Sequence, residues 1–254
     1  MSERRPIDLG ATVAGVRFPF CAMNASGARS STAADLRELA RSDTGAIVLK
    51  TATLHPFLHP EYRSLHNPGY DKLLPFVREL AAGSARPVVA SIAGTTADEY
   101  ATLARAFAEA GAALVEANLA DPYVAATLAP VEETATLRAL LARLVAVCTV
   151  PLSVKLPERA GLPYRLLGEE LARAGVSVVV AKNDFAGFQK LLLETGPGLE
   201  VIAVGGIRSG YDVTRALTRG AKAVQVGSAL VEEGPGIFAR LAREMRAAQG
   251  ARGA

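Results

Sequence analysis

The sequence predicts a (β/α)8 TIM barrel formed by one domain, residues 1–254, with a short N-terminal β-hairpin. Eight short apolar segments alternate with amphipathic helical patterns along the chain. These segments are apolar along their whole length, which is typical of parallel strands covered on both faces, and eight strand–helix units favour closure into a barrel. An open doubly wound sheet is the alternative, although it usually has fewer strands. With 254 residues, half of them hydrophobic, the chain can bury one large core.

The individual elements follow from these patterns in chain order. The opening IDLGATVAGVRF, residues 7–18, is expected to form the hairpin over the barrel floor. Helices are expected over residues 96–111, 132–147, 168–175 and 209–220, and several of these segments end in the glycine that commonly follows a helix. The expected strands are Phe20–Met23, Ala46–Leu49, Pro87–Ile92, Ala113–Ala117, Leu152–Lys155, Val176–Ala181, Val201–Val204 and Ala223–Val226.

Composition and charge disfavour several classes of protein. The formal net charge is +3 and the basic residues are scattered among acids, so no nucleic-acid interface is expected. No uninterrupted apolar run approaches the roughly 18 residues of a membrane span, and the N-terminus lacks the apolar core of a signal peptide. The two cysteines, Cys21 and Cys148, lie in apolar segments without a CxxC spacing. We therefore expect a cytoplasmic protein with reduced thiols and no membrane partner.

Polar residues follow every predicted strand, at the end that faces the catalytic mouth of such a barrel. A single polar residue there can serve a loop turn, but eight polar strand ends together favour a bound ligand. In chain order these segments are MNASG, LKTAT, SIAG, NLADP, VKLP, AKND, VGGIRSG and VGSAL.

The last two of these segments predict a phosphate site. Gly205 and Gly206 follow the seventh strand, and Gly227 and Ser228 follow the eighth. Glycines let backbone N–H groups approach an anion, and the start of a following helix adds its positive dipole. Two tight left-handed turns, for which glycine is the default residue, would give the same pattern.

Two lysines, Lys50 and Lys155, stand at strand ends that should point into the barrel. Desolvating an inward ammonium is costly unless an anionic partner offsets it. Lys155 suits a cation beside an electron-rich ring that gains negative charge on reduction; alternatively, it extends out of the mouth or pairs with Asp121. No metal site is predicted, because the three histidines lie in one proline-punctuated loop without a ligand spacing.

Six motifs extend this pattern over nearly the whole chain: MNASG, VLKTATLHP, EANLADP, LSVKLP, AVGGIRSGYD and GAKAVQVGSALVEEGPGIF. In order and spacing they resemble the flavin barrel of the dihydroorotate dehydrogenases, particularly the soluble class 1 enzymes. The resemblance implies a barrel that holds FMN and oxidises dihydroorotate to orotate, or a related dihydropyrimidine, in pyrimidine biosynthesis.

The resemblance also implies roles for individual residues. Asn118, Asn183 and Asn67 would bind the substrate, and Lys50 would act at the catalytic centre. The residues implied in FMN binding are Ala25, Ser26, Lys50, Thr51, Asn118, Lys155, Gly205, Gly206, Gly227 and Ser228.

The chain departs from the family at the catalytic-base motif. The class 1 motif is Asn-Leu-Ser-Cys-Pro-Asn, with the cysteine (serine in class 2) as the base, whereas residues Asn118 to Tyr123 are Asn-Leu-Ala-Asp-Pro-Tyr. Asp121 is therefore the candidate base. Burial can raise the pKa of a carboxyl group into a useful range, but a carboxylate repels an anionic substrate, and Asp before Pro is also a preferred helix start. The segments after the second and sixth strands are also shorter than in the family.

Three functions from different classes stay open. The first is the FMN-dependent oxidoreductase. The second is a flavin-free barrel lyase or isomerase that acts on a phosphorylated substrate, with Lys155 as a Schiff-base amine and Asp121 as acid or base. The third is a catalytically divergent paralogue that binds flavin or orotate. The electron acceptor stays open too, as does the choice between a homodimer and association with an electron-transfer subunit.

Overall fold

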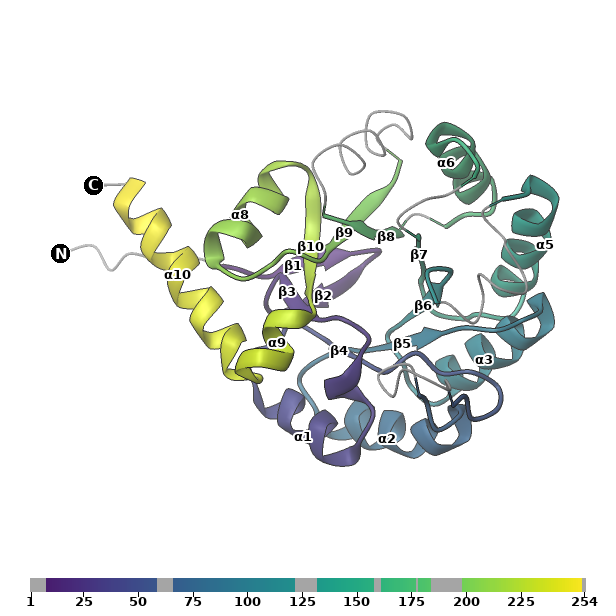
Figure 1. Cartoon of the computed structure of the whole chain (residues 1–254), viewed down its shortest axis with the longest axis horizontal. Helices are drawn as coiled ribbons and strands as arrows, with labels where there is room; N and C mark the ends of the chain where they lie inside the picture. The colour runs from purple at the N-terminus through teal and green to yellow at the C-terminus, as the bar shows by residue number, and fades with distance from the viewer. Residues whose placement is uncertain are drawn as a thin grey trace.

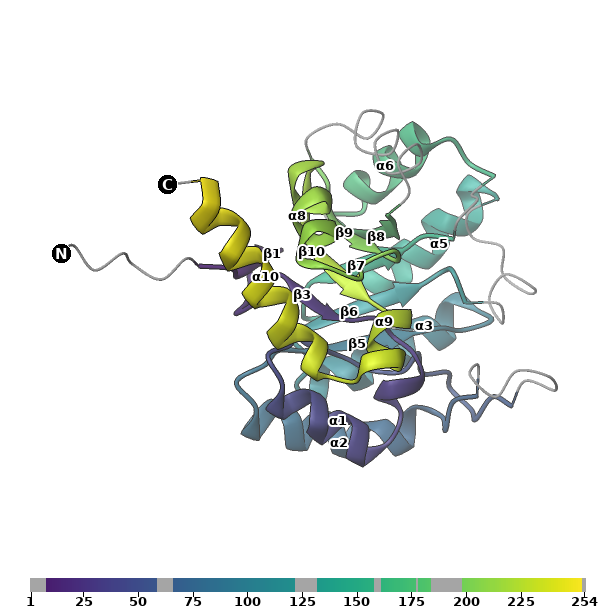
Figure 2. The same cartoon turned by 60° about the vertical axis from the view of Figure 1, so that its left-hand side comes forward.

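The computed structural model describes residues 8–58, 66–121, 132–157, 161–176, 178–183 and 198–252. Eight parallel strands form a (β/α)8 barrel, as predicted, and Figure 1 shows the helices as an outer layer around them. Figure 2 shows the same two layers from another side. The barrel strands are β3 (Ala22–Asn24), β4 (Ile47–Val48), β5 (Val88–Ile92), β6 (Leu114–Asn118), β7 (Leu152–Lys155), β8 (Val178–Lys182), β9 (Glu200–Val204) and β10 (Ala221–Val226).

The outer helices end where the sequence pattern places a stop. Gly111, Gly175 and Gly220 directly follow the C-caps of α3, α6 and α8, and all three have positive φ, between +80° and +108°. This left-handed conformation is the one that glycine adopts at low cost. The helices are η1 (Ala28–Ser30), α1 (Ala33–Arg41), α2 (Tyr70–Gly83), α3 (Ala97–Glu109), α5 (Thr134–Val145), α6 (Tyr164–Arg173), α8 (Gly210–Thr218), α9 (Ser228–Glu233) and α10 (Gly236–Arg252).

The predicted hairpin closes the floor of the barrel. It consists of β1 (Ala11–Val13) and β2 (Val16–Phe18), which pair antiparallel. Val13 and Phe18 are fully buried and pack in one cluster with inward side chains of the barrel strands. The hairpin turn is held to the barrel because Ala14 N donates a hydrogen bond to Glu200 Oε2 at 2.6 Å. Ligand access is therefore left to the opposite end, where the strands finish.

The barrel closes between β3 and β4 through a side chain. Asn24 Nδ2 donates to Val48 O at 2.6 Å, and Asn24 Oδ1 accepts from Val48 N at 2.8 Å. Close approach of the two segments also requires Gly45, because a Cβ there would lie 1.8 Å from Phe20 O. The Asn24 amide thus makes two hydrogen bonds to the β4 backbone in place of backbone pairing between β3 and β4. These bonds also fix the segment after β3 at the mouth.

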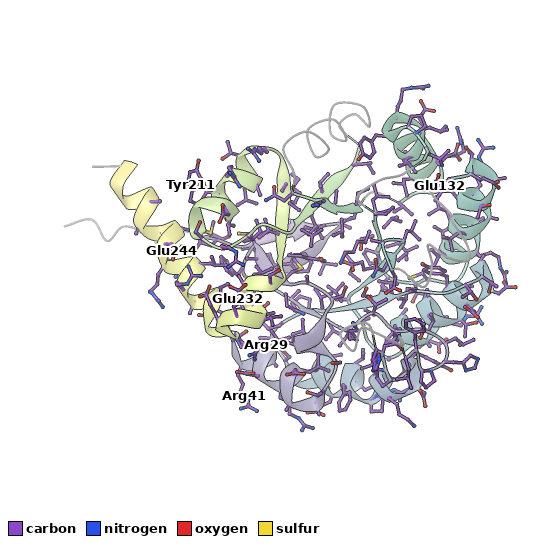
Figure 3. All side chains as sticks on the ribbon, viewed as in Figure 1. Arg29, Arg41, Glu132, Tyr211, Glu232 and Glu244 are labelled. Carbon is purple, nitrogen blue, oxygen red and sulfur yellow. The ribbon has the colours of Figure 1, made fainter. Side chains whose placement is uncertain are left out.

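Glu232 on α9 and Glu244 on α10 are charged side chains of the outer helices (Figure 3). Within the described part of the chain, no helix has both the length and the apolar character needed to cross a bilayer.

Candidate active site

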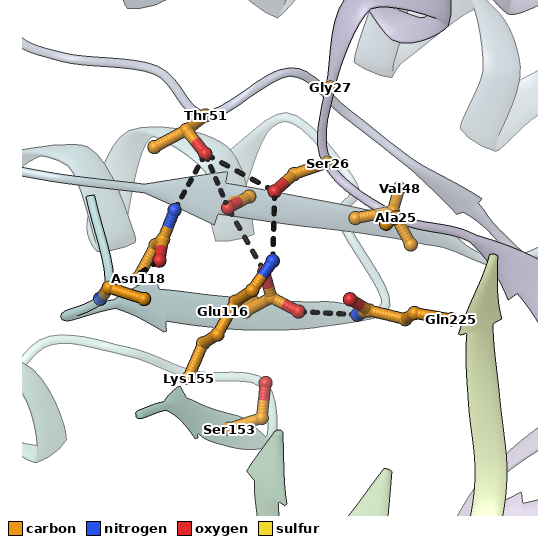
Figure 4. Close-up of polar contacts among 12 residues, drawn as sticks. Ala25, Ser26, Gly27, Val48, Thr51, Glu116, Asn118, Ser153, Lys155 and Gln225 are labelled. Atoms are coloured by element: carbon orange, nitrogen blue, oxygen red, sulfur yellow. Dashed lines mark hydrogen bonds and ion pairs between the residues drawn. The ribbon is translucent and has the colours of Figure 1, made fainter. Parts of the chain in front are cut away.

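A cluster of hydroxyl and amide side chains lies at the mouth of the barrel, with Thr51 at its centre (Figure 4). Thr51 Oγ1 accepts from Asn118 Nδ2 at 2.9 Å, donates to Ser26 Oγ at 3.3 Å and lies 3.1 Å from Ser91 Oγ. Lys155 Nζ donates to the same Ser26 oxygen at 3.4 Å. The structure thus brings together four predicted site residues from four different strand ends: Ser26, Thr51, Asn118 and Lys155.

A buried carboxylate that the sequence analysis missed belongs to the same cluster. Glu116, on β6, is 0% exposed. Its Oε1 accepts from Ser91 Oγ at 3.1 Å, and its Oε2 accepts from Gln225 Nε2 at 2.6 Å. Lys155 Nζ lies 3.9 Å from Oε1. The available signal was an acid in the middle of the otherwise apolar strand LVEAN.

Lys50 and Asp121 interact electrostatically at the mouth. Lys50 is only 8% exposed, and burial lowers its pKa; the negative charge of Asp121 raises it, and the positive charge of Lys155 lowers it further. Asp121 is half-buried just beyond β6, where Asn118 Oδ1 accepts from Ala120 N at 3.1 Å and shapes the turn. Asp121 therefore lies at the mouth with its charge close enough to act on Lys50.

The sequence motif around Asp121 is only partly covered by the structure. Pro122, Tyr123 and the expected helical turn PYVAAT lie outside the described residues. The role of Asp121 as base and its role as helix cap are therefore both still predictions. His59 also lies outside the described residues, whereas His55 is exposed and His66 is half-buried. Among the described residues no three His, Cys, Asp or Glu side chains are grouped so that they could hold a metal ion.

Two glycine loops form a hollow beside the hydroxyl cluster. Gly205 and Gly206, after β9, have φ of +90° and +69°, and a Cβ added to either would meet nothing within 4 Å. A Cβ on Gly227, after β10, would lie 3.9 Å from the Ala25 Cβ, and Ala25 N donates to Val226 O at 2.9 Å. The hollow therefore adjoins the segment that carries Ser26. Its lining consists of Val204, Gly205, Gly206, Ile207, Arg208, Gly227, Ser228 and Ala229.

The glycine loops can be both tight left-handed turns and an anion site, so the two interpretations are compatible in this structure. Positive φ at Gly205 and Gly206 agrees with tight turns, and the open space beside both glycines leaves room for an anion; the phosphate site itself stays a prediction. Arg208, on the same loop, donates two hydrogen bonds of 2.7 Å to the carboxylate of Glu232, which lies on α9. The ion pair therefore links the loop of Gly205 and Gly206 to α9, the helix that follows Gly227.

The remaining two predicted substrate residues differ in their surroundings. Asn183 follows β8, and its backbone N donates to Val204 O at 2.8 Å. Both polar atoms of its amide are buried and have no hydrogen-bond partner among the described residues, which is uncommon for buried polar atoms. Asn67 instead organises its own loop, because its Oδ1 accepts from Thr53 Oγ1 at 2.9 Å and from Gly69 N at 3.0 Å. A substrate contact by either residue stays a prediction.

Comparison with known proteins shows which proteins this chain resembles. Residues 185–248 match the family model described as dihydroorotate dehydrogenase. The dihydroorotate dehydrogenase (fumarate) of Trypanosoma cruzi is 29% identical over 274 residues, which cover 88% of this chain and 87% of that protein. A Streptococcus uberis protein provisionally named dihydroorotate dehydrogenase A (fumarate) is 28% identical over 92% of this chain and 91% of its own length. In both comparisons, the chain is similar to dihydroorotate dehydrogenases.

Solved structures of the dihydroorotate dehydrogenase from Eimeria tenella share the fold. The complex with ferulenol superposes with a TM-score of 0.79 at 15% identity and covers 94% of this chain and 83% of that one. The ligand-free form also gives a TM-score of 0.79, over 96% of this chain and 88% of that one. At this identity the likeness concerns the fold alone. The segment matched by the dihydroorotate dehydrogenase model includes both glycine loops of the hollow.

Proposed function

We propose that the protein binds FMN at the barrel mouth and uses it to oxidise a ring C–C single bond of dihydroorotate or a related dihydropyrimidine. The observation that carries this proposal is the junction of the glycine-lined hollow with the hydroxyl–amide cluster, through Ala25 and Ser26. A phosphate requires backbone N–H groups and open space, and the polar edge of a flavin ring requires hydrogen-bonding groups beside it. The mouth offers both at adjacent positions.

The residues present fit FMN in both parts of the site. Gly205, Gly206, Gly227 and Ser228 would hold the single terminal phosphate, while Ser26, Thr51, Asn118 and Lys155 would contact the ring. Bound FMN would supply the capacity to accept two electrons from the substrate. Lys155 would place a positive charge beside the ring where negative charge develops, which is the most effective form of electrostatic stabilisation.

The neighbouring polar residues would bind the substrate and take its proton. Asn118 and Asn183 would hydrogen-bond the polar edge of the substrate ring, and the unpartnered amide of Asn183 supports this role. Asp121 would accept the proton from the substrate carbon next to the one that loses hydride. Lys50 would attract an anionic substrate, whereas Asp121 would repel it. We therefore expect slow turnover of dihydroorotate itself.

The pairing of Lys155 supports a flavin site over the lyase or isomerase alternative. A Schiff base forms from a neutral amine. Lys155 Nζ instead lies 3.9 Å from the buried carboxylate of Glu116 and donates to Ser26. A carboxylate and a hydroxyl oxygen beside Nζ are contacts that suit a positive charge next to a ring.

A matched pair of substitutions at Gly206 tests the phosphate site. Asn and Asp have similar size and are the residues that best tolerate positive φ, so both should fit the open space at this position. Only Asp adds a negative charge, which repels a phosphate by about 4 kcal/mol at 4 Å with an effective dielectric constant of about 20, and by less at an exposed site. Gly206→Asp should therefore bind FMN at least about tenfold more weakly than Gly206→Asn, with equal melting temperatures. FMN titration by fluorescence quenching measures this difference, and equal affinities would place the phosphate elsewhere.

A further inference from the structure

The function proposed above gives the buried carboxylate of Glu116 no step in binding or proton transfer, although Glu116 contacts Ser91, Lys155 and Gln225. We infer that Glu116 is a positioning residue of the flavin site: it holds the ammonium of Lys155 and orients the hydroxyl groups of Ser91, Thr51 and Ser26. This inference rests on the proposed function, because the positions it concerns are those where the ring would bind. It is carried by the contacts of Glu116 within the barrel.

Burial of a carboxylate is difficult to explain by stability alone. Removing a charge from water costs several kcal/mol, and an apolar pair of similar volume is often as stable as a buried ion pair. Glu116 is nevertheless 0% exposed, on a strand whose other residues are also buried. Its partners come from separate strands: Ser91 on β5, Lys155 on β7 and Gln225 on β10. The barrel therefore gathers donors from several directions around one carboxylate.

Gln225 turns the NH2 side of its amide toward this carboxylate. Gln225 is 1% exposed and donates its Nε2 to Glu116 at 2.6 Å. Its own Oε1 is buried and has no hydrogen-bond partner in the described part of the chain. The contact with Glu116 is therefore made although it leaves the amide oxygen of Gln225 without a partner among the described residues.

The hydrogen bond that Glu116 accepts from Ser91 sets the direction of the hydroxyl chain. Ser91 donates its only hydroxyl hydrogen to Glu116, so it acts as an acceptor toward Thr51. The hydrogen of Thr51 is then shared between Ser91 and Ser26. Ser26 also accepts from Lys155, which can only donate. The hydroxyl hydrogen of Ser26 is thus left for an acceptor at the mouth, where the ring edge would lie.

The same carboxylate fixes the position of the Lys155 ammonium. Lys155 is 13% exposed, and its Nζ lies between Glu116 Oε1 at 3.9 Å and Ser26 Oγ at 3.4 Å. Lys50, the other cation at the mouth, interacts unfavourably with Lys155 and favourably with Asp121. Electrostatic attraction by Glu116, inside the barrel, therefore holds the long Lys155 side chain in the hydroxyl–amide cluster and prevents it from extending toward solvent.

A double-mutant cycle between Glu116 and Lys155 tests the inference. The measured quantity is the ratio of the affinities for reduced and oxidised FMN, obtained from the midpoint potentials of bound and free FMN. Glu116→Gln should lower this ratio by about tenfold or more, or about 30 mV for a two-electron couple, in the same direction as Lys155→Met. In the Lys155→Met background the same Glu116→Gln change should alter the ratio by less than about threefold.

The reciprocal exchange Glu116→Gln with Gln225→Glu separates positioning from folding. It keeps one carboxylate and one amide in the buried pair but moves the charge from β6 to β10. We expect its melting temperature to lie closer to that of the parent than that of Glu116→Gln alone does, because the buried hydrogen bond is preserved. We expect the affinity ratio to stay about tenfold low, because the charge has left Lys155.

Several results would overturn the inference. A rise of the ratio in Glu116→Gln would show that Glu116 acts as a direct negative charge on the ring, and an equal change in both backgrounds would show that it does not act through Lys155. An affinity ratio equal to that of the parent in Glu116→Gln would also contradict the inference. If Glu116→Gln fails to fold, a parent-like ratio in the reciprocal exchange would contradict it. Failure of the proposed function is recognised separately, because the unmodified protein would then bind no FMN, and the inference would fall with it.

Discussion

The Asp121→Asn variant is expected to fold and to retain FMN, while the rate at which substrate reduces the flavin falls by about 10²–10⁴-fold, the usual contribution of a positioned general base. Asn caps a helix about as well as Asp, so a capping role is preserved and only the proton acceptor is lost. The negative charge that raises the pKa of Lys50 is also removed, so the pKa of Lys50 should fall further. Anaerobic stopped-flow reduction and thermal melts measure the two effects separately.

Two further substitutions at Asp121 distinguish the base from the cap. If Asp121 only starts a helix, Asn should leave both rate and stability unchanged, and Ala should cost about 1 kcal/mol of stability with little kinetic effect. The Asp121→Cys variant should oxidise dihydroorotate to some extent if only the base differs from the family. It should not oxidise dihydroorotate if Tyr123 and the shortened segment after the second strand have adapted the pocket to another ring. A kinetically silent Asn variant would remove Asp121 from the catalytic residues.

The Lys155→Met variant is expected to reduce its flavin about 10²-fold more slowly, because the positive charge is lost where negative charge develops in the transition state. Affinity for oxidised FMN should fall by less than about tenfold, since the neutral ring gains less from that charge. Some loss of stability should accompany the change, because Glu116 then keeps a buried charge without its cation.

Lys222→Met is the matched control for Lys155→Met. Lys222 is an exposed lysine of β10, so the same chemical change is made away from the hydroxyl–amide cluster. Its flavin reduction and FMN affinity should equal those of the parent. Equal reduction rates in Lys155→Met and the parent would show that Lys155 has no electrostatic role in the reaction.

The fold was predictable from sequence because local pattern and tertiary arrangement agree. Strands such as LVEAN are buried at every position, and helices end at Gly111, Gly175 and Gly220, where positive φ is required. The device that closes the barrel was not predictable in the same way. The side chain of Asn24 makes the hydrogen bonds that join β3 to β4, and no sequence pattern indicates this. Gly45 is required because a Cβ there would clash with Phe20 O, and this contact exists only in the folded barrel.

The site was predictable as a set of strand ends but not as a network. The contact between Asn118 and Thr51 joins residues 67 positions apart, and only barrel closure brings them together. Glu116 was missed because a single acid in an apolar strand has no pattern of its own, and its meaning depends on Gln225, 109 positions away. For Asn67 the resemblance implies a substrate contact, which stays a prediction; its side-chain oxygen accepts hydrogen bonds from Thr53 and Gly69 within its own loop.

The most direct test of the proposed function is the visible absorption spectrum of the purified protein, recorded under anaerobic conditions while dihydroorotate or a related dihydropyrimidine is added. The proposal predicts a flavin band that is released by acid as FMN and that bleaches with substrate, slowly with dihydroorotate. Release of FAD, or absence of a flavin band even after reconstitution with FMN, would contradict it.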